Sequence, residues 1–268
     1  MPLTYGKYLK VPELLSLQEG SSPPHHDEQL FIIIHQVYEL WFKLVLHEVD
    51  SAVAHLAEDR VGEATRLLRR VVEVQHLLIS QVRILETMRP QDFLGFRYQL
   101  NPASGFQSVQ FRELEFLLGL KDAAVCARLV CEPEEADRLR RRLAAPSLTD
   151  AVDDLFVRRG FPREPPPAAP RGGATEPEEW RLQALVRIYE DAEAHADFVA
   201  LCEVLIEMDE CLALWRAHHV QMVERMIGAK RGTGGSEGVA YLRSTLPKRA
   251  FPDLWRVRSS LGQEPEEQ

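Results

Sequence analysis

The sequence predicts an all-α protein, a bundle of long helices in a single domain spanning residues 1–268. Three observations lead to this prediction. Apolar residues recur at spacings of three and four along most of the chain, the alternation typical of strands is nearly absent, and 45% of the 268 residues are hydrophobic. Such a chain buries a sizeable core, and the helices on either side of its one proline-rich break look incomplete alone, so we expect one domain.

The helical pattern is clearest between Asp27 and Leu56, where Asp27 is the expected N-cap. The apolar positions that repeat there are Leu30, Ile34, Val37, Trp41 and Leu44. Further helices are expected, in order, over Val61–Thr87, Ser108–Leu118, Glu134–Leu143, Leu148–Arg158, and from Glu178 through Ile188 to Ile227.

Three segments are expected to lie outside these helices. Residues 1–20 form an extended N-terminal segment. Residues 158–179 hold six of the 17 prolines, which predicts an exposed, partly extended connection. The acidic end, residues 262–268, is expected to be disordered.

Composition narrows the class of protein. The net charge of −9 argues against electrostatic binding of nucleic acid. The start, MPLTYGKYLK, lacks the apolar core of a signal peptide, and the longest apolar run, LFIII, is far shorter than a membrane span. The cysteines show neither a CxxC pair nor a zinc spacing. We therefore expect a cytoplasmic protein without nucleic-acid or membrane partners.

The segment KRGTGGSEG, which begins at Lys230, invites comparison with nucleotide-binding loops. It fails the phosphate-loop pattern because Lys230 precedes the glycines and a helix precedes the lysine. It fails the dinucleotide pattern because Glu237 stands where the third glycine belongs. Two interpretations stay open: a flexible segment whose hydroxyls, on Thr233 and Ser236, close over a carboxylate or ammonium group, and a helix C-cap with a long turn.

Two histidines lie on apolar helix faces. His219 shares a face with Trp215, Met222 and Met226, whereas its neighbour His218 lies about 100° around the helix. Residue types in this pattern fit either a core histidine or the axial ligand of a haem, which needs one imidazole on a rigid helix.

His35 follows Phe31 by one helical turn. A flat aromatic ligand could therefore stack on Phe31 and hydrogen-bond to His35, although core packing explains the pair equally well. Metal alternatives are weaker, because there is one ExxH sequence (Glu73 to His76) where a di-iron bundle needs two, and no HExxH.

The stretch from Met88 to Gln107 is punctuated by proline and glycine and predicts a loop. It carries Arg97 among aromatic residues, which is the composition of a small-molecule pocket. The guanidinium of Arg97 suits bidentate pairing with a substrate carboxylate. The alternative is that the aromatic rings anchor the loop and Arg97 caps a helix end.

Taken together, these segments resemble the tryptophan 2,3-dioxygenase family. The resemblance runs in order from Leu3 to Leu261, and it is carried by LTYGKYL, HHDEQLFIIIHQVYELWFKL, LETMRPQDFLGFR, NPASGFQSVQFRELEFLLG, KRGTGGSEGVAYL and FPDLWRVRSSL. It implies an α-helical homotetramer that binds one haem b per subunit, ferrous when active. It also implies an enzyme that uses O2 to cleave the indole C2–C3 bond of L-tryptophan, giving N-formyl-L-kynurenine in the kynurenine pathway of tryptophan degradation.

The resemblance also implies roles for single residues. His219 matches the axial ligand of the haem iron, with His218 a bystander. His35 matches the distal histidine that hydrogen-bonds the indole N–H, and Phe31 matches the ring packed on the indole. The further matches are Arg97 to the partner of the substrate carboxylate, Thr233 to the residue that contacts its ammonium and carboxylate groups, and Ser104 to a haem-pocket serine.

Tyr5, Tyr8 and Leu9 match an N-terminal segment that enters a neighbouring subunit's active site. The sequence departs from the family pattern at two pocket positions: Phe93 replaces a tyrosine near the haem propionate or substrate, and Val82 replaces a tryptophan on the proximal side. Three rivals remain at this point, namely a haem-dependent monooxygenase acting on a related indole or aromatic substrate, a haem carrier or gas sensor, and a purely structural bundle.

Overall fold

The computed structural model describes residues 2–161, 163, 179–234 and 237–262. In that part of the chain every regular element is a helix, which confirms the predicted all-α class. The α-helices are α1 (Tyr5–Leu9), α2 (Val11–Leu14), α3 (His26–Ala57), α4 (Val61–Leu85), α5 (Pro90–Arg97), α6 (Val109–Leu117), α7 (Ala123–Arg128), α8 (Pro133–Ala144), α9 (Leu148–Arg158), α10 (Glu179–Glu190), α11 (Ala196–Ile227), α12 (Val239–Ser244) and α13 (Pro252–Arg256). Short 3-10 turns occupy Tyr98–Leu100, Gly105–Gln107 and Val257–Ser259.

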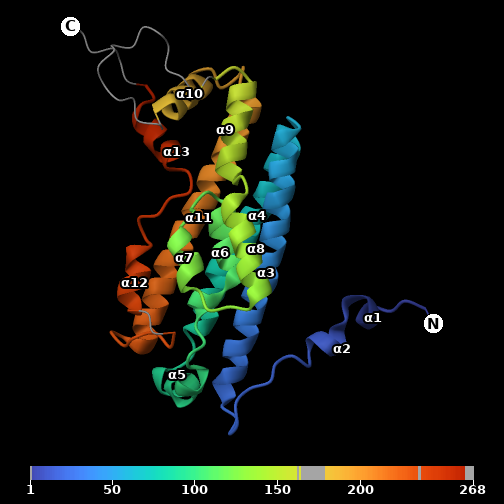
Figure 1. Ribbon diagram of the computed structural model, residues 1–268, viewed down its shortest axis with the longest axis vertical. Coiled ribbons are helices and arrows are strands. Elements are labelled where there is room, and N and C mark those ends of the chain that lie inside the picture. Colours follow the sequence, from blue (N-terminus) through green and yellow to red (C-terminus); the bar gives the residue numbers. More distant parts are fainter. Residues whose placement is uncertain (1, 162, 164–178, 235–236, 263–268) are drawn as a thin grey trace.

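Three long helices form the frame of the bundle. α4 packs on both α3 and α11 along their lengths, and α6 and α9 pack against α3 (Figure 1). The packing follows from the apolar stripe at spacings of three and four, whose members on α3 include the buried Ile34, Phe42 and Val49. The long helices thus supply rigid supports for side chains far apart in the sequence.

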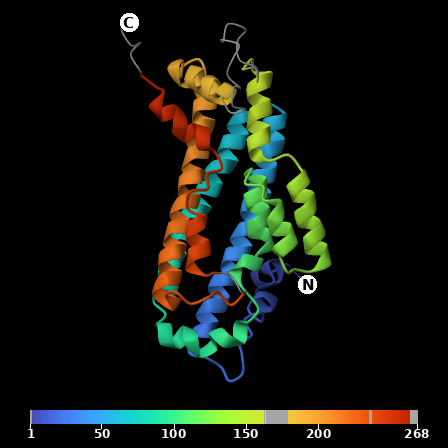
Figure 2. The ribbon, with the colours of Figure 1, turned by 60° about the vertical axis from the view of Figure 1, so that its left-hand side comes forward.

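The two ends of the bundle differ. α5 crosses the end where α3 begins and α11 finishes, and α12 lies beside α11 near that same end (Figures 1 and 2). α10 and α13 pack together at the opposite end. The loop from Lys230 onward and α5 therefore meet at the end of the bundle that holds the cavity described below.

Most of the predicted helices are confirmed, but several details are wrong. α3 begins at His26 with His25 in the cap position, so Asp27 is not the N-cap; it lies in the first turn, where its carboxylate still interacts favourably with the helix dipole. The predicted loop at Met88–Gln107 contains α5, because Pro90 is well suited to the first turn of a helix. The continuous helix expected through Ile188 to Ile227 is interrupted by a turn after Glu190.

The N-terminal segment is not extended as predicted. It folds as α1 and α2, two short helices that stand away from the bundle in Figure 1 and contain no buried residue. α7, α12 and α13 were not predicted, since each is too short for an apolar period to show. The predictions for the proline-rich connection (158–179) and the acidic tail (262–268) fall almost wholly outside the described residues.

α3 is the one helix in the described part of the chain that is long and apolar enough, by length and composition, to cross a membrane. The same features are found in the core helix of a helical bundle. α3 makes such contacts with α4, α6 and α9, and part of its remaining apolar surface faces the internal cavity.

A buried carboxylate fastens the C-terminal segment to the bundle. Asp209 on α11 is 2% exposed and accepts hydrogen bonds from the Ala250 backbone N–H (2.8 Å) and the Trp255 indole N–H (2.9 Å). Nearby, Arg181 on α10 donates to Asp153 on α9 and to Asp253 on α13, and these bonds raise the pKa of the guanidinium further above its ordinary value. Polar contacts therefore fix α13 at the end remote from the cavity.

Replacing Asp209 by alanine should destabilise the protein by about 2–4 kcal/mol, because two or more buried donors lose their charged acceptor. Urea unfolding measures this loss. The matched control is Asp154→Ala, which removes an exposed carboxylate paired with Arg163 and should cost no more than about 0.5 kcal/mol. Equal effects of the two substitutions would show that Asp209 does not anchor the C-terminal segment.

Candidate active site

A cavity of about 300 Å³ lies inside the bundle near α5. Its walls come from α3, α4, α5, α6, α11 and α12 together with the loops at Ser104 and Thr233. The predicted site residues that line it are Phe31, His35, Val82, Phe93, Arg97, Ser104, His219 and Thr233. Tyr5, Tyr8 and Leu9 do not line it, and lie exposed on α1.

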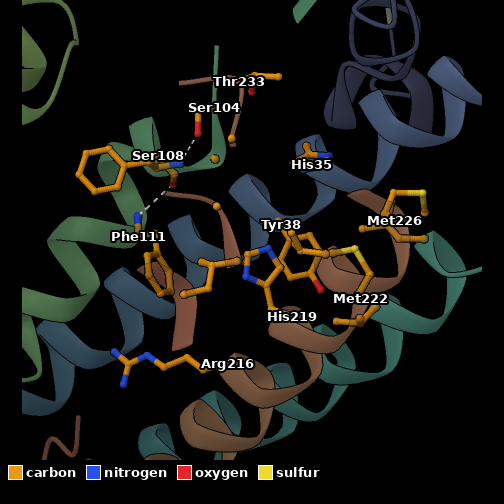
Figure 3. Close-up of a pocket in the computed structure, with 18 of the residues that line it drawn as sticks. His35, Tyr38, Ser104, Ser108, Phe111, Arg216, His219, Met222, Met226 and Thr233 are labelled. Carbon is orange, nitrogen blue, oxygen red and sulfur yellow. Dashed lines mark hydrogen bonds between the residues drawn. The ribbon is translucent and has the colours of Figure 1, made fainter. Parts of the chain in front are cut away.

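The His219 ring points into the middle of the cavity (Figure 3). Burial of the ring, together with the nearby His35, lowers the pKa of His219 to about 4. No hydrogen bond to the ring is found among the described residues. His219 is therefore a neutral imidazole with a free nitrogen lone pair on an apolar wall, the state that metal ligation requires.

His35 is oriented by its own helix. Its Nδ1 lies 2.7 Å from the Phe31 carbonyl oxygen, and because a carbonyl only accepts, Nδ1 carries the proton. Desolvation by the surrounding cavity walls lowers the pKa of His35, although the residue keeps more than a third of its surface exposed, and this hydrogen bond and Glu39 act in the opposite direction. The neutral ring thus offers the Nε2 lone pair as an acceptor, which suits an N–H donor on a bound molecule.

Aromatic rings build the wall beside His35. Phe31 lies 4.0 Å from the His35 ring, 5.8 Å from Phe93 and 5.7 Å from Phe96, measured between ring centroids. Phe96 is fully buried and anchors α5, whereas Phe31 and Phe93 face the cavity. Within the stretch from Met88 to Gln107, Phe96 therefore anchors the segment, whereas Phe93 and Phe106 line the cavity.

Two hydrogen bonds hold the described start of the segment KRGTGGSEG (residues 230–234, the glycine segment) at one end of the cavity, while its Gly235 and Ser236 lie outside the described residues. Arg97 donates from Nη2 to the Arg231 carbonyl, and Thr233 Oγ1 donates to the Ala103 carbonyl at 2.6 Å. The close approach needs Gly234, because a Cβ there would lie 2.6 Å from the Cβ of Ser104. Figure 3 shows Thr233 and Ser104 together at one edge of the pocket.

Thr233 keeps oxygen lone pairs available after donating to Ala103, so it can accept from an ammonium group. Arg97 is nearly buried, and its carbonyl partner leaves further N–H groups for a carboxylate. The two side chains thus form an end of the cavity suited to the zwitterionic part of an amino acid.

A buried charge cluster, Arg112–Glu115–Arg216, also lines the cavity. Glu115 accepts from Arg112 at 2.6 Å and from Arg216 at 2.9 Å, and Arg112 also lies 4.7 Å above the Phe106 ring. Two guanidinium groups share one carboxylate, so the cluster retains one positive charge facing the cavity.

Sequence reasoning missed this cluster and Tyr38, which also lines the cavity. Arg112 and Glu115 fall in the amphipathic pattern of α6, and nothing in the sequence distinguishes them from solvent-facing charges. A weak signal existed for Arg216, a charge one turn before His219 on a largely apolar helix.

The fold and site define a class of protein. An all-helical bundle that presents two neutral imidazoles to an apolar cavity, with cations at its edges, has the features of a protein that binds a flat metal-containing cofactor and a small aromatic ligand together. In the described residues no group of three or more histidine, cysteine or acidic side chains could hold a bare metal ion.

Comparisons with known proteins identify the family. The family model described as "Tryptophan 2,3-dioxygenase" matches residues 1–157 and 180–261. The chain is 50% identical over 265 residues to tryptophan 2,3-dioxygenase of Nocardioides sp., covering 97% of this chain and 95% of that protein. It is 45% identical over 259 residues to the enzyme of the same name from Anaeromyxobacter sp. (97% and 96% covered), and 42% identical over 272 residues to that of Myxococcus xanthus (98% and 91%).

The chain belongs to the tryptophan 2,3-dioxygenase family. It is therefore an oxidoreductase, and the predicted family and enzyme class are confirmed. The roles of individual site residues remain predictions.

The low pKa of His219 predicts a pH dependence of stability in the haem-free protein. The folded pKa of about 4 lies below the ordinary 6.5, so the unfolded chain binds more protons between these values. Stability should fall as the pH drops from 6.5 towards 4, by up to about 3 kcal/mol from this residue. The free energy of unfolding, measured with urea at about pH 7 and about pH 4.5, should therefore fall less in His219→Leu than in the unmodified protein.

The control is His47→Leu, which removes an exposed histidine on α3 and should keep the unmodified pH dependence. An equal loss of stability with falling pH in the unmodified protein and in His219→Leu would contradict the neutral state assigned to His219.

Proposed function

We propose that this chain cleaves the indole C2–C3 bond of L-tryptophan with O2 to give N-formyl-L-kynurenine, using a haem b whose iron is held by His219. The observation that carries the proposal is that His219, His35 and Arg97 converge on one apolar cavity in a member of this family. Haem, when bound, supplies the site for O2 and the oxidising chemistry.

The residues present fit a haem. His219 offers a neutral imidazole on the rigid helix α11 with no hydrogen bond to a described residue, and the wall around it is largely apolar. The positive charge retained by Arg112–Glu115–Arg216 suits the acidic side chains of a haem, which would otherwise be buried without partners. Ser104 and Phe93 would lie at the edge of the cofactor.

The chain's own contribution is orientation of the substrate. Arg97 binds the substrate carboxylate and Thr233 accepts from its ammonium group, which fixes the amino-acid end. His35 accepts the indole N–H through Nε2, and Phe31 packs on the indole ring. Holding the substrate in a fixed position relative to O2 makes a bimolecular reaction effectively unimolecular.

Closure of the cavity contributes the exclusion of water. The glycine segment is tied over one end by the hydrogen bonds of Arg97 and Thr233 to backbone carbonyls. Arg97 has further N–H groups and Thr233 has oxygen lone pairs for the substrate, so both side chains can keep these bonds, and hold the segment in place, while the pocket is occupied.

A haem-dependent monooxygenase acting on a related indole is the runner-up and is not favoured, because an amino-acid substrate explains both Arg97 and Thr233. We further propose a cytoplasmic homotetramer in which Tyr5, Tyr8 and Leu9 enter a neighbour's active site. Their exposure, 78%, 71% and 45%, on a short helix detached from the bundle supports that assembly.

Removing the His219 side chain should abolish haem binding. The His219→Ala protein should lose the Soret band after reconstitution with haem, because the iron loses its proposed protein ligand. His218→Ala is the matched control, since His218 does not line the cavity, and it should keep the band. Retention of the band in His219→Ala and its loss in His218→Ala would reverse the assignment.

Removing the Arg97 guanidinium should raise KM for tryptophan at least about tenfold, because charge-assisted bonds to the carboxylate are lost. Arg89→Ala, which changes an exposed arginine on the cap of the same helix, should leave KM within about twofold, roughly 0.4 kcal/mol. Tryptamine, which lacks the carboxylate, provides the second comparison.

The Arg97→Ala protein should bind tryptophan and tryptamine with similar affinity, whereas the unmodified protein should prefer tryptophan. A KM for tryptophan within about twofold of the unmodified enzyme would remove Arg97 from the carboxylate role.

A further inference from the structure

His219 is held by a stacked ring rather than by a hydrogen bond to a described residue. The Trp215 indole lies one turn earlier on α11, with its centroid 5.2 Å from that of the His219 ring and an angle of 11° between the two planes. The rings are therefore nearly parallel, so rotation of the imidazole about χ2 would bring it against the indole face.

The Trp215 ring is itself fixed by a hydrogen-bond chain across three helices. Its indole N–H donates to the Tyr38 hydroxyl on α3 at 3.4 Å, and that hydroxyl donates to the Leu78 carbonyl on α4 at 2.6 Å. Burial raises the pKa of Tyr38, so the phenol keeps the proton that it donates. The chain places Trp215 relative to the frame of the bundle rather than to α11 alone.

General core packing does not account for this arrangement. The contacts of Trp215 with Tyr38 and Phe111 are inclined at 60° and 43°, as expected for rings that fill space. Of these three ring contacts of Trp215, the one with His219 is nearly parallel. It involves the ring that faces the middle of the cavity in Figure 3. In the hydrogen-bond chain, the Trp215 N–H donates to Tyr38 and the Tyr38 hydroxyl donates to Leu78, so one orientation of the indole is specified.

We infer that Trp215 and Tyr38 are positioning residues that fix the plane of the His219 imidazole for axial ligation. The inference rests on the proposed function, in which His219 ligates the haem iron. The hydrogen bond from Trp215 to Tyr38 orients the indole, and the indole stack orients the imidazole. A ligand ring held in this way needs no carboxylate or carbonyl partner on the protein to set its plane.

The test uses Trp215→Phe, Tyr38→Phe and the double variant in the haem-loaded protein. Each single substitution removes the same hydrogen bond and keeps an aromatic ring at the position. Resonance Raman spectroscopy of the ferrous protein reports the iron–histidine stretching band, and transfer of haem to an apoglobin reports the rate of haem loss. A matched control is Tyr189→Phe, which removes a hydroxyl bonded to Glu203 away from the cavity.

Both single variants should shift the iron–histidine band in the same direction and speed haem loss about fivefold, equivalent to about 1 kcal/mol. The double variant should differ little from the stronger single variant, since both act on one bond. Tyr189→Phe should change neither measurement. Additive effects, or an unmoved band in both single variants, would overturn the inference.

Trp215→Phe carries the test alone if Tyr38→Phe folds poorly, because it leaves the Tyr38–Leu78 bond in place. The outcome also separates this inference from the proposed function. Absence of the band from the unmodified protein, or its retention in His219→Ala, contradicts the axial role itself. A band present in the unmodified protein, absent from His219→Ala and unmoved by Trp215→Phe contradicts only the positioning role.

Discussion

The rest of the site depends on one constraint, namely that two uncharged imidazoles, His35 and His219, line the same apolar cavity. Protonation of either ring would place a charge against aromatic and aliphatic walls, and the low pKa of His219 expresses that cost. The nearby His35 also disfavours protonation of His219. One neutral lone pair is thereby available to a metal and the other to an N–H donor, which are the two requirements of the proposed chemistry.

The frame of long helices explains how such a site can be held. α3 supplies His35 and α11 supplies His219, and both helices pack against α4. A ring on a long, well-packed helix has little freedom to move, and Tyr38 and Trp215 connect the same three helices inside the cavity. The proposed substrate contacts come instead from Arg97 on α5 and Thr233 of the glycine segment, at one end of the cavity. In the proposed function, rigid helices would hold the cofactor, and a loop and the short helix α5 would hold the amino-acid end of the substrate.

The sequence was sufficient for the fold class and for the main helices, because long amphipathic stripes leave a clear period. It failed for α5, where Pro90 resembles a loop signal but begins a helix, and for α1, which is too short to show a pattern. The site residues found from the resemblance all line the cavity except those of the N-terminal segment.

The charge cluster and the Trp215–Tyr38 bond could not have been predicted. Arg112 precedes Glu115 by one turn of α6, but Arg216 is 101 positions away from Glu115, and its approach depends on how α6 and α11 are placed relative to each other. Likewise, 177 positions separate Trp215 from Tyr38, and an indole N–H has no partner that a local pattern can reveal. Tertiary packing decides these contacts, whereas helical period decides the elements that carry them.

Turnover of L-tryptophan by the haem-reconstituted protein under isotope-labelled oxygen gas tests the central claim most directly. The account predicts N-formyl-L-kynurenine in which both new oxygen atoms carry the label, because both atoms of one O2 molecule enter the substrate. A product with a single labelled oxygen, or a hydroxylated indole with its ring intact, would contradict the account.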